Sequence, residues 1–136
     1  MNKRKKLLAL IPALWAGLFD STITIVHQPK EYWNGNLNTA NEANTIGNFM
    51  MKQHVSGIFI VCGIWLILIG IIGYYLPKKY SRIFLLFVLI AHSFGASTWL
   101  SNHYGFWTAI IFILFNSILF YKIDDLINKE NVQNGI

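Results

Sequence analysis

The stretch that decides the fold is 55–76, VSGIFIVCGIWLILIGIIGYYL, in which 22 consecutive residues include no charged side chain. An α-helix rises 1.5 Å per residue, so this stretch is long enough to cross the roughly 30 Å hydrocarbon core of a bilayer. A helix that is apolar all round must be covered on every side by protein or by lipid. The stretch therefore predicts a membrane-spanning helix.

Three more segments of similar length and apolar character lie on both sides of this stretch in the chain. They are 7–26, 83–100 and 104–121. Only 101–103 separates the last two, which predicts a tight turn there. We therefore expect an all-α integral membrane protein, a four-helix transmembrane bundle that forms one domain over 1–136, with an outer loop at 27–54 and a tail at 122–136.

The composition agrees with a membrane protein. Hydrophobic residues make up 54% of the chain and charged residues only 12%, against about 25% charged in an average soluble domain. The mean hydropathy is +0.45. These values exclude soluble enzymes and disordered tails, and they predict the lipid bilayer as the first partner of the chain.

The basic residues are distributed unevenly about the four segments. Nine of the eleven Lys and Arg lie before the first segment, between the second and third, or after the fourth, whereas only Lys30 and Lys52 lie on the other side. Because Lys and Arg accumulate in cytoplasmic loops, both termini are expected in the cytoplasm. The basic residues flank apolar segments and form no continuous face, so nucleic acid is not expected as a partner.

The N-terminal region has a second interpretation. A basic run at 3–6 followed by an apolar stretch at 7–19 also fits a secretory signal peptide. Large residues stand near the possible cleavage points and the apolar pattern resumes at 23–26, so we expect an uncleaved first span. The expected location is a prokaryotic inner or plasma membrane, with multiple spans.

Small residues recur at helical spacing and predict where helices approach one another. Without a hydrophobic driving force between helices in lipid, small side chains mark close packing. The expected interface positions are Ala9, Ala13 and Gly17 in the first segment, Ser56, Gly63 and Gly70 in the second, and Ala91 and Gly95 in the third.

Polar residues within the spans form the candidate site. Ionisable side chains in a membrane are expensive and usually face the bundle interior or a cavity. At 1.5 Å per residue, Asp20, His92 and Asn116 lie about 9, 12 and 18 Å below the outer edges of their segments. These depths predict a polar chain across three helices, in which Asp20 is either protonated or paired with His92 as imidazolium.

Two interpretations of these residues remain open. In the first, Asp20, Thr24 and His92 line a polar cavity that opens outward and is covered by the Asn-rich loop with Glu42. In the second, Asp20 and His92 are a buried hydrogen-bonded pair that fixes the register of two helices. Asn116 would extend the polar set in either case.

Metal binding is a weaker hypothesis. Asp20 with His54, His92 and His103 offers suitable ligand types, but their depths differ and the spacing matches no recognised zinc motif. No metal and no other cofactor is therefore predicted.

The order Asp20, Ser21, Thr22 and Thr24, followed by Glu42, Ala43 and Asn44, resembles a family of uncharacterised small prokaryotic membrane proteins with four spans. Members carry Asp and Thr in the first span and Glu-x-Asn-Pro before the second. The resemblance covers roughly 15–125, and Thr45 stands where those proteins have Pro. It implies no activity, but it implies that Asp20, Glu42 and Asn44 belong to one site.

Three functions are compatible with this sequence. The first is a non-enzymatic structural or interaction subunit, which would have a membrane-protein partner or form a homo-oligomer. The second is proton or ion handling through the cavity at Asp20 and His92. The third is an intramembrane enzyme that acts on lipid, with Asp20 and Glu42 as acid and base.

The predicted topology can be tested by labelling. In a background with Cys62→Ala, single cysteines at Asn36 and Asn102 should react with an impermeant maleimide added outside intact cells, and a cysteine at Lys79 should not. The reverse labelling pattern would contradict the orientation drawn from the charge distribution.

Overall fold

The computed structural model describes residues 3–133, with side chains as far as Lys129, and nearly all of this range is helical. The four long helices are α1 (Lys3–Val26), α4 (Gly57–Tyr75), α5 (Lys78–Tyr104) and α6 (Phe106–Gln133). The connection between α1 and α4 contains the short helices α2 (Lys30–Trp33), η1 (Leu37–Thr39) and α3 (Thr45–Met51).

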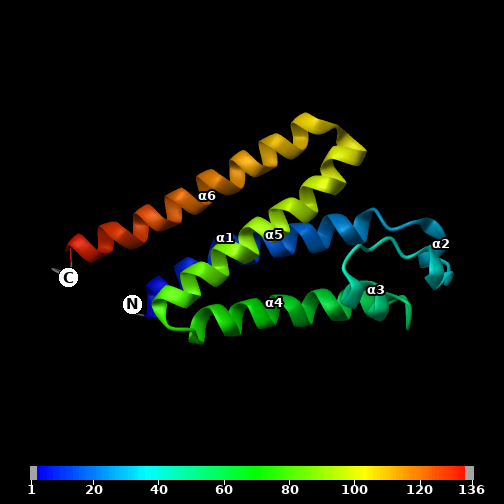
Figure 1. The fold of residues 1–136 in the computed structure, drawn as a ribbon, viewed down its shortest axis with the longest axis horizontal. Coiled ribbons are helices and arrows are strands. Elements are labelled where there is room, and N and C mark those ends of the chain that lie inside the picture. Colours follow the sequence, from blue (N-terminus) through cyan, green and yellow to red (C-terminus); the bar gives the residue numbers. More distant parts are fainter. Residues whose placement is uncertain (1–2, 134–136) are drawn as a thin grey trace.

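The long helices run alternately in opposite directions, so the N- and C-terminal ends of the described chain lie at one end of the molecule and the short helices at the other (Figure 1). We call these the terminal end and the loop end. Both α1 and α5 pack against each of the other long helices. They form the central pair, with α4 and α6 as its flanking helices.

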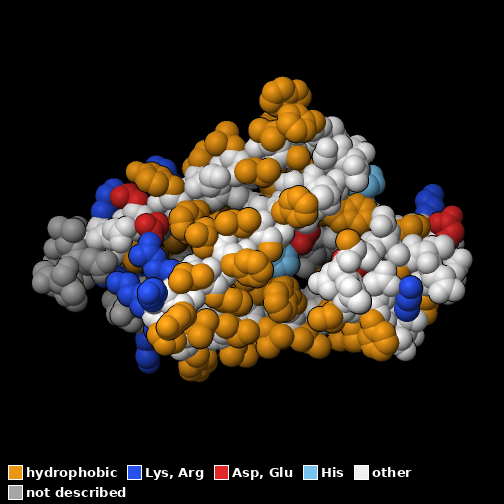
Figure 2. Space-filling model, viewed as in Figure 1, with side chains coloured by type: hydrophobic (Ala, Val, Ile, Leu, Met, Phe, Trp, Pro, Cys, Tyr) orange, Lys and Arg blue, Asp and Glu red, His pale blue; other side chains and the backbone are white. Residues whose placement is uncertain are grey.

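Each of the four long helices has the length and apolar character needed to cross a membrane. Many large hydrophobic side chains on them remain exposed, and Figure 2 shows them over most of the visible helical surface. Such a surface suits contact with lipid. The described structure therefore agrees with the predicted all-α, four-helix architecture.

Helix ends differ from the expected ones on either side of α5. This helix begins at Lys78, directly after Pro77, five residues before the expected start at 83. The turn expected at 101–103 is not there, because those residues are helical and the chain reverses at Gly105. Gly105 has φ 90, a conformation that glycine adopts without steric cost.

The last helix also continues through most of the segment expected to be a tail. Arg82 of α5 donates to Asp124 of α6 at 2.7 Å, which holds the helix beyond its expected end at 121. Lys129 pairs with Asp125 at 2.7 Å, one helical turn away. Such pairs at four-residue spacing stabilise a helix.

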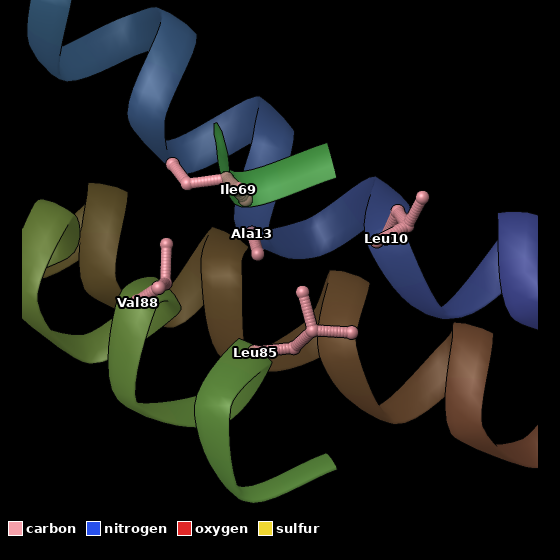
Figure 3. Packing of buried hydrophobic residues seen from close by; sticks show 5 residues of the cluster. All are labelled: Leu10, Ala13, Ile69, Leu85 and Val88. Carbon is pink, nitrogen blue, oxygen red and sulfur yellow. The ribbon is translucent and has the colours of Figure 1, made fainter. Parts of the chain in front are cut away.

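The apolar core nearest the terminal end joins α1, α4 and α5. Its buried side chains, labelled in Figure 3, are Leu10, Ala13, Ile69, Leu85 and Val88. Gly73 of α4 lies against this cluster, and a β-carbon there would overlap side-chain atoms of both Leu10 and Leu85. We call Leu10, Ala13, Ile69, Leu85 and Val88 the apolar layer.

The small-residue pattern predicts contacts correctly in α1 but not in α4. Ala13 and Gly17 are buried against neighbouring helices, as expected. By contrast, Gly63 and Gly70 have no neighbouring atom within 4 Å of an added β-carbon. The close glycine contacts of α4 are instead at Gly73, which faces the central pair, and at Gly57, which faces α3.

Gly57 allows α3 and α4 to approach closely, since a β-carbon at this position would overlap the carbonyl oxygen of Met50. We expect Gly57→Ala to lower the free energy of unfolding by about 3 kcal/mol, as overpacking against backbone does. Gly63→Ala is the matched control in the same helix and should be neutral or stabilise by up to about 1 kcal/mol. Thermal unfolding in detergent, followed by circular dichroism, measures both variants. Equal stability of the two would contradict the close packing.

Candidate functional site

The floor of the candidate site is a hydrogen-bonded chain that links three helices. Asp20 of α1 and His92 of α5 meet at 2.7 Å, carboxylate Oδ2 to imidazole Nδ1. On the opposite side of the ring, Trp65 of α4 donates from Nε1 to His92 Nε2, also at 2.7 Å. The pairing of Asp20 with His92 is the one that their depths predict.

The indole of Trp65 fixes the form of the histidine. A tryptophan N–H can only donate, so His92 Nε2 must offer its lone pair and carry no proton. The proton of the neutral ring is then on Nδ1, from which His92 donates to the Asp20 carboxylate. In the imidazolium, which the sequence analysis also allows, Nε2 of His92 would carry an N–H that faces the indole N–H of Trp65. Protonation of His92 therefore requires the hydrogen bond from Trp65 to break.

A glycine makes this approach of carboxylate and helix possible. A β-carbon on Gly95 would lie 2.9 Å from each of the two carboxylate oxygens of Asp20. The carboxylate therefore rests against the bare backbone of α5, one turn from His92. The small-residue pattern predicts close packing at Gly95, and in the structure the Asp20 carboxylate is the group that packs against it.

A cavity of about 190 Å³ lies above the floor, on the loop side. Its lining is mostly polar: Asp20, Thr24, Asn41, Glu42, Ala43, Gly95, Thr98, Trp99 and Asn102. Figure 2 shows acidic and histidine side chains in a recess of the otherwise apolar surface. The cavity thus brings together Asp20, Thr24 and Glu42 from the residues expected at the site, whereas His92 does not line it and is connected to it through Asp20.

The cover of the cavity is held by a buried amide. Gln28 donates from Nε2 to the carbonyl oxygen of Asn41 at 2.8 Å and accepts from the Asn41 N–H at 2.9 Å. A second anchor is Tyr32, which is completely buried and donates to the carbonyl oxygen of Val55 at 3.0 Å. These bonds fix the backbone next to Glu42, so the Asn-rich connection is an ordered cover.

Burial raises the pKa of Glu42 above its ordinary value of 4.5. Its hydrogen bond from the backbone of Asn44, at 2.6 Å, opposes this pKa shift, and the negative charge of Asp20 adds to it. A raised carboxyl pKa means that the folded protein holds this proton more tightly than the unfolded chain. The associated stability is present below pH 4.5 and is lost as the pH rises through the raised pKa.

Asn44 has a different role from the one the resemblance implies. Its Oδ1 accepts from the N–H groups of Ile46 and Gly47, at 3.0 and 3.5 Å, and so caps α3. It does not line the cavity. Thr45 is the first residue of α3, a position that proline also favours, so a helix begins here without the proline of the resembling family.

Asn116 belongs to a separate polar cluster and does not extend the chain from Asp20 and His92. It accepts from Trp15 Nε1 at 3.1 Å and donates to Ser93 Oγ at 2.8 Å. Consecutive residues of a helix point about 100° apart. His92 consequently faces α4 and Ser93 faces α6, so one stretch of α5 carries two polar contacts.

The histidines proposed as weaker metal ligands are engaged at three different places. His54 contacts Ser56 Oγ at 2.8 Å through Nδ1, and His92 is in the floor chain. The ring of His103 lies 4.1 Å from that of His27, centroid to centroid. In the part of the chain that the structure describes, no three His, Cys, Asp or Glu residues are grouped so that they could hold a metal ion.

Sequence reasoning missed the indole partners Trp15 and Trp65, and the loop anchor Gln28. A signal was present for the two tryptophans, since an indole N–H inside an apolar span needs an acceptor. Both lie well inside their spans, away from the interfaces where Trp usually gathers. No comparable signal marks Gln28, which lies among other polar loop residues.

The assigned histidine form predicts a spectroscopic result. In protein with ¹⁵N-labelled histidine at pH 8, His92 should give the shifts of a ring protonated at Nδ1 and unprotonated at Nε2. Trp65→Phe removes the donor at Nε2 and should shift that resonance, whereas Trp33→Phe, in the loop, should not. A ring protonated at Nε2 in the wild-type protein would contradict the proposed direction of both hydrogen bonds.

Comparison with known proteins gives no relative from which a function could be transferred. No protein-family description, curated protein or solved structure matches the chain. What the site does is therefore inferred from its own residues.

Proposed function

We propose that the chain is an integral membrane protein with four spans, located in a prokaryotic inner or plasma membrane, and with both termini in the cytoplasm. The four long apolar helices and the uneven distribution of Lys and Arg support this placement. In this orientation the cavity above Asp20 faces the outer side of the membrane.

We further propose that the protein is a non-enzymatic membrane subunit that takes up a proton or a small cation in this cavity. The observation that carries the proposal is the chain of hydrogen bonds that starts at Asp20 in the cavity wall and continues through His92 to Trp65 outside the cavity. A carboxylate bonded to a neutral imidazole can accept one more proton, and uptake of that proton on His92 breaks the hydrogen bond from Trp65 and so changes the contact between α4 and α5.

The charges around the cavity favour a positively charged occupant. Asp20 and Glu42 both line it, with oxygen-bearing side chains of Thr24 and Thr98 nearby. The charge of Asp20 disfavours ionisation of Glu42, so a cation between them would relieve the repulsion. Oxygen atoms are also the ligands that hard cations and protonated amines prefer.

The apolar layer below the site favours binding over passage. Val88 of α5 lies one turn from His92, and Ile69 of α4 lies one turn from Trp65. Both side chains are buried, together with Leu10, Ala13 and Leu85. An ion at the floor would have to cross this layer without polar partners, at a cost of several kcal/mol. Uptake at the site would instead alter the contact between α1 and α5, which suits a subunit that responds to pH or cations.

Proton uptake tests this function directly. When the pH of detergent-solubilised protein is lowered from 8 to 5, the wild type should take up about one proton more than His92→Gln, which lacks the imidazole of the pair. Asp20→Asn should reduce this uptake, because the pair loses the carboxylate that bonds to His92. Glu31→Gln, which removes an exposed loop carboxylate, is the matched control.

An indicator dye measures this uptake, and liposomes with an imposed pH gradient measure passage. We expect no proton flux above that of empty liposomes, because the apolar layer separates the site from the terminal end. Unchanged uptake curves in Asp20→Asn would leave the pair as a structural contact only. A proton flux that is lost in the same variant would point to a conduit instead.

A further inference from the structure

Two cavities outside the candidate site lie along the contact between α5 and α6. The first, of about 180 Å³, lies near the terminal end, where α1 forms part of its wall. The second, of about 400 Å³, is farther along the same two helices. Leu86 and Phe120 line both, so the cavities are neighbours along these helices. We call the two cavities together the α5–α6 groove.

The two parts of the groove differ in chemistry. At the terminal end, Lys78, Arg82 and Asp124 line its mouth. From there to Phe94 and Ile113 the walls are almost wholly apolar, with Ser93, Asn116 and Ser117 as the polar exceptions. A charged mouth that leads into an apolar channel matches an amphipathic molecule with one long hydrocarbon chain.

The length of the groove matches one leaflet of a bilayer. Phe94 follows Arg82 by twelve positions on α5, which corresponds to about 18 Å along the helix. Half of the hydrocarbon core is about 15 Å. One acyl chain of a phospholipid therefore fits between the mouth and the far end.

The charge at the mouth is positive. Asp124 pairs with Arg82 at 2.7 Å and balances it, so the charge of Lys78 is in excess. The mouth also coincides with the N-terminal turn of α5, whose free amide groups carry partial positive charge. Basic side chains gather at this end of the molecule in Figure 2, which raises the potential further.

We propose that the α5–α6 groove binds one acyl chain of an anionic phospholipid from the leaflet at the terminal end, with its phosphate at Lys78 and the first turn of α5. This inference rests on insertion of the helices into a membrane, and it is independent of proton uptake at Asp20. It assigns a ligand to a face of the protein that the candidate site does not use.

Lipid binding by the purified full-length chain tests the proposal. Protein stripped of lipid is titrated with dioleoyl phosphatidylglycerol or dioleoyl phosphatidylcholine, which differ only in the headgroup, and followed by native mass spectrometry. The anionic lipid should bind about fivefold more tightly, the effect of one basic residue near a membrane surface. Lys78→Gln should remove this preference. Lys79→Gln, the same change at the next residue but outside the groove lining, should retain it.

A second pair of variants tests the acyl-chain path. Leu86→Trp fills the junction of the two cavities and should weaken binding of both lipids, whereas Phe87→Trp, at an exposed position outside the groove, should not. Circular dichroism checks that each variant is folded. Ser117→Phe repeats the test from α6, so the result does not depend on one substitution.

Three outcomes would overturn the proposal. The first is equal affinity for the two lipids, or equal loss in Lys78→Gln and Lys79→Gln. The second is displacement of the lipid by millimolar inorganic phosphate, which would mean that the mouth binds a free anion. The third is a dimer that binds no lipid and dissociates in Leu86→Trp, which would mean that a second copy of the chain covers the groove.

Discussion

The constraint on which the structure depends is a carboxylate inside an apolar helix. In the proposed membrane placement, a charged side chain at this depth costs about 3 kcal/mol or more unless it finds a partner. Asp20 meets this constraint by drawing α1 against α5, where His92 donates to it and Gly95 leaves room for it. Trp65 adds α4 to the same chain of bonds. This chain of hydrogen bonds therefore fixes the positions of α1, α4 and α5 relative to one another.

Much of this arrangement follows from the sequence because its causes are local. Uninterrupted apolar length specifies the four long helices whatever their neighbours are. The depth of a polar residue depends only on its distance from the end of its span, which is why Asp20 and His92 could be paired in advance. The expected cavity residues Thr24 and Glu42 also lie where the loop and α1 meet.

The remaining features depend on how each helix is rotated, which no single segment encodes. Gly63 and Gly70 form a regular stripe, yet α4 presents Gly57 and Gly73 to its neighbours. For the same reason, the depth of Asn116 wrongly predicted a place beside Asp20 and His92. The rotation of α6 instead turns Asn116 toward Trp15 and Ser93. Turn positions are equally difficult to predict where polar residues continue a helix, as they do at 101–103. There, one backbone conformation at Gly105 decides where the chain reverses.

The single-residue connection at Gly105 also bears on how the protein enters a membrane. Because only one residue lies between α5 and α6, one helix cannot cross a bilayer while the other stays in water. In the proposed membrane placement, the two would therefore insert together as a helical hairpin, with a short tip because the chain reverses at Gly105. The α5–α6 contact, and the part of the groove that these two helices line alone, would then form before either helix reaches its final depth. Lipid would accompany this hairpin from the moment of insertion.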